Sequence, residues 1–204
     1  MIKDIYLLFI NKYLLFLHHK FQNYSNMSKA NNFVFWSLYI IAWLIFVGLS
    51  IEAGGLIVNF FFSFYKPELI PNLYQKLDLM DMYKESRLAF FGMYSFILIV
   101  STLKACMFYI VIRLMHKMNR SKPFNSFVSR QIFHIGYLTI SIGLLSYIAS
   151  KSAKNLMHHG FITENLNQFW VDSEAFVLMG AVIYIIATIF KKGVDLQTEN
   201  DLTV

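Results

Sequence analysis

Residues 88–114, LAFFGMYSFILIVSTLKACMFYIVIRL, decide the fold class of this chain. Their only charged side chains are Lys104 and Arg113, and they contain no proline. A helix needs about 20 predominantly apolar residues to cross the ~30 Å hydrocarbon core of a bilayer. We therefore predict that this stretch spans a membrane.

Three other stretches have the same character, at residues 33–64, 132–150 and 175–190. Hydrophobic residues make up 57% of the 204-residue chain and charged residues only 15%, whereas a soluble domain carries about 25% charged residues. We predict an all-α protein: an integral membrane four-helix transmembrane bundle with short amphipathic interfacial helices in the outer loops. Run 33–64 exceeds one straight crossing, so it forms either a long tilted helix or one that breaks at Gly54 and Gly55.

The connection between the second and third spans contains no acidic residue. Basic residues gather in loops on the cytoplasmic side of membrane proteins. We therefore expect a bacterial cytoplasmic (inner) membrane protein with both termini in the cytoplasm, and we expect no direct binding of nucleic acid despite the net charge of +6. Asn125 or Ser126 could cap the third helix. The basic residues at this face are Arg113, Lys117, Arg120, Lys122 and Arg130, together with Lys191 and Lys192 after the fourth span.

The two outer connections carry apolar residues at helical spacing. In the first, Pro67 and Pro71 lie at the start of such a pattern, which covers residues 69–80, and the second extends over residues 151–174. A segment of this kind places its apolar face in the membrane interface. Each connection is therefore predicted to contain a short interfacial helix.

Residues 1–31 form a separate extension, followed by a transmembrane domain at 32–192 and a tail at 193–204. The extension allows three interpretations: an interfacial helix, a signal peptide without a small-residue cleavage site, or residues ahead of a true start at Met27.

Two stretches together resemble a known family. The first is Lys122–Pro123–Phe124 with His134–Ile135–Gly136–Tyr137, and the second is IFKKGVDLQTENDLTV at 189–204. They are similar to the YoaS-like bacterial membrane proteins, grouped as domain of unknown function 2975, over residues 33–204. The resemblance implies four membrane helices. It also implies a small helix-turn-helix DNA-binding partner of the Cro repressor type, because many members are encoded beside one. It supplies no activity, cofactor or catalytic residue.

Glu52 and Lys104 are the sharpest candidates for a site. An ionisable group at membrane depth is costly unless it is paired or hydrated. If the first two spans are antiparallel neighbours, the two residues differ in depth by roughly 6 Å at 1.5 Å per residue. We hypothesise a buried ion pair. The alternative is that Glu52 lies at the outer interface and Lys104 extends towards the headgroups.

The tail is a second candidate, since a hydrophobic carboxyl terminus can be captured by a partner's backbone groups. Asp201, Leu202 and Val204 would make this contact, and the basic residues of the same face would bind a partner or anionic lipid. The alternative is a polar stop after the fourth span.

The remaining chemistry-bearing residues do not converge. Cys106 is the single cysteine, and adjacent His158 and His159 would point in different directions on a helix. No metal, nucleotide or catalytic motif stands out, so we expect no cofactor and no enzyme. Glycines at 48, 54, 55, 136 and 143 are suited to close helix packing. Two functions remain open: an interaction protein that holds a regulator, or a small transporter or channel subunit, whose four helices would require a homo-oligomer.

Overall fold

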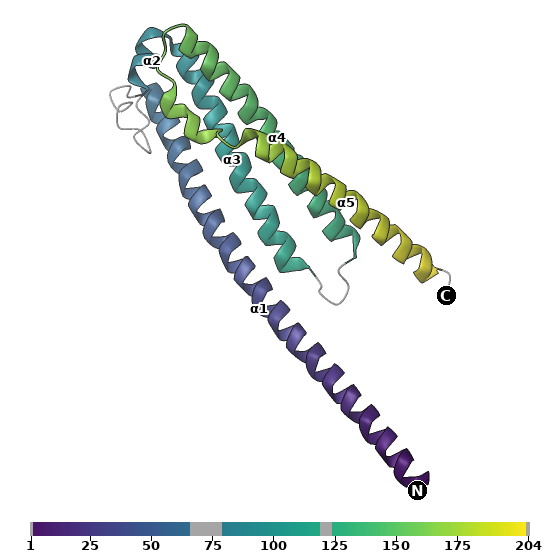
Figure 1. Ribbon diagram of the computed structural model, residues 1–204. Coiled ribbons are helices and arrows are strands. Elements are labelled where there is room, and N and C mark those ends of the chain that lie inside the picture. The colour runs from purple at the N-terminus through teal and green to yellow at the C-terminus, as the bar shows by residue number, and fades with distance from the viewer. Residues whose placement is uncertain (1, 66–78, 119–123, 203–204) are drawn as a thin grey trace. The chain divides into compact units, whose positions relative to one another are not determined.

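The computed structural model describes residues 2–65, 79–118 and 124–202. Within these ranges the chain is helical and has no strand (Figure 1). The amphipathic helix predicted for residues 69–80 lies outside the described residues except at its last two positions. The elements are α1 (Ile2–Tyr65), α2 (Met80–Glu85), α3 (Arg87–Lys117), α4 (Ser126–His158), the 3-10 helix η3 (Glu164–Phe169) and α5 (Ser173–Leu202).

Four helical segments of the described chain are long and apolar enough to cross a membrane: Asn32–Tyr65, Arg87–Lys117, Ser126–His158 and Glu164–Asn200. The all-α fold class and the four spans are therefore confirmed. The protein is a multi-pass membrane protein.

The chain divides into two units, residues 1–41 and residues 42–204, and α1 contributes to both. In the first unit Trp36 and Tyr39 make an edge-to-face contact with ring centroids 6.0 Å apart. In the second unit the helix runs through Gly54 and Gly55 without interruption, so of the two alternatives the continuous helix is confirmed and the break at the glycine pair is wrong. In hydrocarbon an unsatisfied backbone group costs several kcal/mol, which outweighs the roughly 1 kcal/mol helix penalty of a glycine.

Side chains and one glycine set the helix ends. Ser86 Oγ accepts a hydrogen bond from Ala89 N at 3.3 Å and caps α3. Asn125 Oδ1 accepts one from Val128 N at 2.9 Å, which confirms the cap predicted for α4. At the other end of α4, Gly160 has φ +92°. Phe161 N then donates to Leu156 O at 3.2 Å and Gly160 N to Met157 O at 3.1 Å, which is a Schellman motif.

Aromatic side chains join α1 to α3 in antiparallel register. Phe64 stacks on Phe91 with centroids 4.4 Å apart, and Phe60 contacts Tyr94 at 5.3 Å. Tyr94 is fully buried and donates a hydrogen bond to the carbonyl oxygen of Leu56 at 3.1 Å. These contacts set the register of residues 42–65 against α3.

We expect Tyr94→Phe to lower the free energy of unfolding by about 1 kcal/mol, because it removes one buried hydrogen bond and keeps the ring. Thermal unfolding in mild detergent, followed by circular dichroism, measures the change. Tyr109→Phe is the matched control, since that tyrosine is half exposed. Equal melting temperatures for the two variants would contradict the prediction.

Helices α4 and α5 approach each other closely at their glycines. A Cβ atom at Gly143 would lie 2.7 Å from Val177 N, and one at Gly180 would lie 2.8 Å from Ile140 N. A Cβ at Gly136 would be 3.4 Å from Ile183 Cγ2. Small residues allow backbones to approach in this way. The predicted packing role thus holds for Gly136 and Gly143, while Gly48 and Gly54 have nothing within 4 Å of a Cβ.

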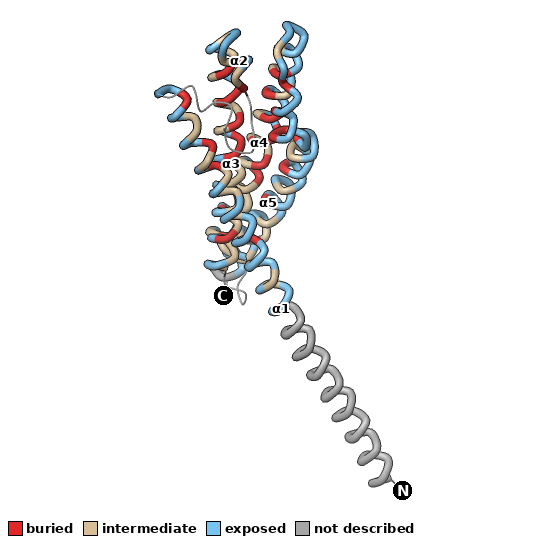
Figure 2. Tube along the Cα trace, turned by 90° about the vertical axis from the view of Figure 1, so that its left-hand side faces the viewer, coloured by how far each residue is buried: buried red, intermediate tan, exposed pale blue. Residues whose placement is uncertain are grey.

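One cluster of buried residues draws on α1, α2, α3, α4 and η3, and Figure 2 colours the buried residues red along the tube. Phe90, Ile97 and Leu166 are completely buried in this cluster. A smaller cluster around Val100, Met107 and Ile142 lies further along α3 and α4. By contrast, most side chains of residues 42–65 are exposed, as expected for a helix that faces lipid.

Candidate functional site

Lys104 lies on α3 and is half-buried. Its Nζ donates a hydrogen bond to the carbonyl oxygen of Phe169 at 3.4 Å and lies 5.7 Å from the centre of the Phe176 ring. The ammonium also interacts electrostatically with Glu52 and Asp172. One cation thus connects α3 with η3, with the start of α5 and with two carboxylates.

Glu52 lies at nearly the same depth as Lys104. Counted from the stack of Phe64 on Phe91, each is between three and four turns inward, or about 20 Å. No direct ion pair joins the two side chains, which both belong to the described residues. The structure therefore brings the two charges within electrostatic range. That each charge stabilises the other stays a prediction.

The chain returns into the bundle between α4 and α5. Because Phe169 and Phe176 contact Lys104, the end of η3 and the start of α5 lie at the level of Lys104. From that level α3 continues to Arg87 for another 17 residues, roughly 25 Å. Along α5 this level, at Phe176, is 15 residues or about 22 Å from Lys191, so it lies in the half of a ~30 Å hydrocarbon core that is remote from Lys191. The sequence indicated an interfacial segment here but gave no sign of this depth.

Non-helical backbone at membrane depth must be buried in protein or line a water-filled cavity. Leu166, Phe169 and Trp170 meet the first condition, since each is almost completely buried. Thr163 adds a hydrogen bond from its hydroxyl to Ala153 O at 3.3 Å. These contacts hold the Phe169 carbonyl oxygen in place for Lys104.

The far end of the bundle, at the basic loop, is organised by Phe124. Its ring stacks on Phe190 with centroids 4.7 Å apart. It also lies beside Gly193, where an added Cβ would be 3.1 Å from the ring. The residue after Lys122–Pro123 therefore packs on the start of the C-terminal segment. The structure joins the two stretches of sequence on which the family resemblance rests.

A groove of about 380 Å³ runs beside this contact, between α4 and α5. Arg130, His134, Lys191 and Asp195 contribute its polar lining. Arg113 lies at the same end, with its guanidinium 5.9 Å from the Phe127 ring.

The other residues predicted for this face are not gathered in the groove. Lys117 is exposed at the end of α3, and Lys192 is exposed on α5. Arg120, Lys122 and Val204 lie outside the described residues. Asp201 and Leu202 end α5, so the tail continues the helix to Leu202, and its capture by a partner stays a prediction.

Among the described residues, no group of three or more His, Cys, Asp or Glu side chains is placed to hold a metal ion. His159 bonds Asn155 O through Nδ1 at 2.8 Å, and Cys106 is exposed without a disulfide. Asp172 and the Phe169 carbonyl are the two site features that sequence reasoning missed.

The sequence profile of DUF2975, a family described as a protein of unknown function, matches residues 73–204. The chain belongs to this family. The resemblance drawn from the sequence is thereby confirmed. The DUF2975 match contains Lys104, Asp172, Phe124 and the whole of α5, whereas Glu52 precedes it. No curated protein and no solved structure matches the chain significantly.

Proposed function

We propose that this DUF2975 protein is a membrane-embedded regulatory protein that holds a small helix-turn-helix DNA-binding regulator at its basic-loop face. The packing of Phe124 on Phe190 and Gly193 carries the proposal. This contact joins the basic loop and the helical tail into one surface that contains a groove. The family resemblance supplies the class of partner, and the DNA is bound by the partner alone.

The orientation is part of the same proposal. A regulator can be held only if the basic-loop face lies in the cytoplasm, as the positive-inside rule indicates. A reporter fused after Val204 should be active in the bacterial cytoplasm. Periplasmic activity of that fusion would contradict the orientation and remove the proposed function with it.

We expect reversal of charge in the groove to abolish capture of the regulator. Arg130→Glu combined with Lys191→Glu replaces two exposed cations with anions, and like-charge juxtaposition at an interface costs several kcal/mol. The measurement is co-purification of an epitope-tagged regulator with the full chain in mild detergent. Deletion of 193–204 should have the same effect.

Lys84→Glu with Arg87→Glu is the matched control, because it makes the same charge change at the opposite end of the bundle. The proposal predicts full capture by this control. Equal loss in both double variants would mean that net charge alone governs capture, and no capture by the unaltered chain would refute the proposed function.

A transporter or channel subunit is the second candidate, favoured by Lys104 within a membrane-spanning helix beside a segment that returns into the bundle. Ionisable groups and broken helices within the membrane line transport pathways. Proteoliposomes should then show a proton or ion flux that Glu52→Gln abolishes. A flux equal to that of protein-free vesicles would exclude this function.

A further inference from the structure

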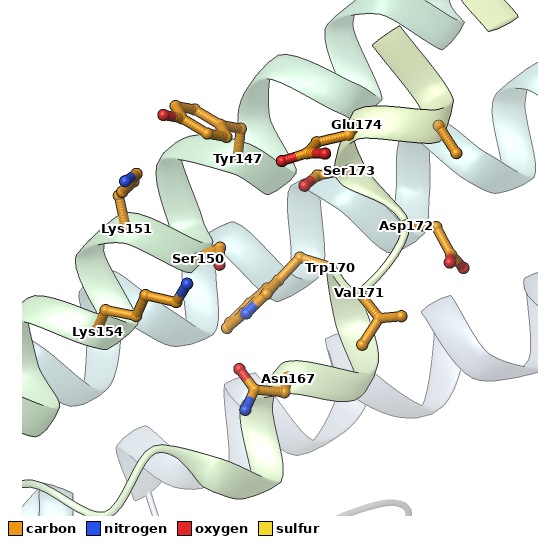
Figure 3. A pocket seen from close by; sticks show the side chains of 11 residues that line it. Tyr147, Ser150, Lys151, Lys154, Asn167, Trp170, Val171, Asp172, Ser173 and Glu174 are labelled. Atoms are coloured by element: carbon orange, nitrogen blue, oxygen red, sulfur yellow. The ribbon is translucent and has the colours of Figure 1, made fainter. Parts of the chain in front are cut away.

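A cleft of about 740 Å³ opens between the last turns of α4 and the junction of η3 with α5 (Figure 3). Its volume falls in the ~300–1,000 Å³ range of small-ligand sites. Tyr147, Ser150, Lys151 and Lys154 line it from α4, and Trp170 and Glu174 line it from the other side. This cleft belongs neither to the basic-loop face nor to the site around Lys104.

Trp170 has an unsatisfied donor at the cleft. The residue is only 3% exposed, and its indole Nε1 has no hydrogen-bond partner. A buried N–H group without a partner is costly, and native structures rarely retain one without a reason. Figure 3 shows the indole ring between the side chains of Lys154 and Asn167. The missing acceptor would therefore enter from the cleft.

The charges of the cleft are divided between its two sides. Lys151 and Lys154 lie one turn apart on α4, and Lys151 Nζ is 5.5 Å from the Tyr147 ring centre. Asp172 and Glu174 lie at the start of α5. Figure 3 shows the Glu174 carboxylate directed toward the α4 side and the Asp172 carboxylate directed away from it, and neither makes a direct ion pair with Lys151 or Lys154 in this described region. Such an arrangement suits a ligand that carries both a negative and a positive group.

An apolar stripe continues from the cleft along α5. Leu178, Ile185 and Ile189 are 59–69% exposed. At 3.6 residues per turn they lie on the same side of the helix as Glu174. A molecule with its polar part in the cleft would place an attached hydrocarbon chain against this stripe. That geometry favours a lipid over a soluble zwitterion.

We propose that the cleft binds the headgroup of a zwitterionic phospholipid of the phosphoethanolamine type. The phosphate accepts hydrogen bonds from Lys151, Lys154 and the Trp170 indole N–H. The ammonium group bonds to the Glu174 carboxylate. One acyl chain lies along the exposed stripe of α5.

Native mass spectrometry of the delipidated full chain in detergent tests the proposal. Phosphatidylethanolamine should bind at least about threefold more tightly than phosphatidylglycerol with the same acyl chains. Lys154→Gln should weaken this binding about tenfold, as expected for loss of a charge-assisted hydrogen bond. Lys84→Gln, a single exposed lysine on α2, is the control and should bind as the unaltered chain does.

Two variants separate headgroup recognition from general adhesion of lipid. Trp170→Phe should weaken phosphatidylethanolamine binding several-fold while the melting temperature of the lipid-free protein stays equal or rises, because the substitution removes an unpaired donor. Glu174→Gln should abolish the preference over phosphatidylglycerol. A lower lipid-free melting temperature with unchanged affinity in Trp170→Phe would overturn the role of the indole.

Two other outcomes would overturn the ligand itself. Equal binding of the two lipids to the unaltered chain would show that the carboxylates do not select an ammonium group. Competition by free phosphoethanolamine at the concentration at which the lipid binds would show that the α5 stripe adds nothing. Both outcomes leave the regulator proposal standing, since they concern the opposite end of the bundle.

Discussion

Replacing Gly180 with valine is expected to lower the free energy of unfolding by about 3 kcal/mol, the upper end of the usual cost of overpacking. A Cβ at this position would lie 2.8 Å from the backbone nitrogen of Ile140 and 3.2 Å from its Cα. These are backbone atoms of α4, so the new side chain can be accommodated only if the two helices separate. The melting temperature and the size-exclusion profile in mild detergent measure the effect.

Gly48→Val is the matched control for this prediction. Gly48 also lies within a membrane-spanning helix, but a Cβ there has nothing within 4 Å. The two variants share the change in helix propensity and differ only in the neighbouring atoms. Equal melting temperatures for both would show that the close crossing of α4 and α5 does not hold the bundle together.

Neutralising Lys104 or Glu52 alone is expected to destabilise the protein more than neutralising both. In Lys104→Gln the amide keeps a donor for the Phe169 carbonyl oxygen, so the change isolates the charge. Each single variant leaves the opposite charge within a membrane-spanning helix without its counterpart. We expect a coupling of about 1 kcal/mol in a double-mutant cycle, within the range found for neighbouring residues.

Asp172→Asn provides the comparison within the same site, since this carboxylate also acts on Lys104. A coupling of Lys104 with Asp172 but none with Glu52 would replace the hypothesised pair by one between α3 and the start of α5. Additive effects in both cycles would mean that water, and not either carboxylate, stabilises the lysine.

The four spans could be predicted because hydrocarbon imposes one local requirement, a long apolar helix, that each stretch satisfies by itself. The Asn125 cap was predictable for the same reason, since it involves residues three positions apart. The continuity of α1 through Gly54 and Gly55 could not be decided from the sequence. The low helix propensity of glycine is measured in water, whereas in hydrocarbon an unpaired backbone group costs more free energy than a glycine in the helix does.

The site was only partly predictable because its contacts are distant in sequence. Lys104 could be chosen from its charge within an apolar run, but its hydrogen-bond acceptor is a backbone oxygen 65 positions away. No side-chain pattern marks a backbone acceptor. Asp172 in turn looked like one more polar residue of a loop, and it reaches Lys104 only because residues 161–172 fold back along α3 and α4.

Helix α5 runs from Ser173 to Leu202 without a break in its described residues. Its first turn carries Phe176, whose ring lies against the Lys104 ammonium, and its far half carries Phe190 and Gly193 at the basic loop. A hydrogen-bonded helix is stiff along its axis, so these two places cannot shift independently. Any displacement that tilts or slides the start of this helix near Lys104 would also move the surface at its other end, without a hinge within the helix.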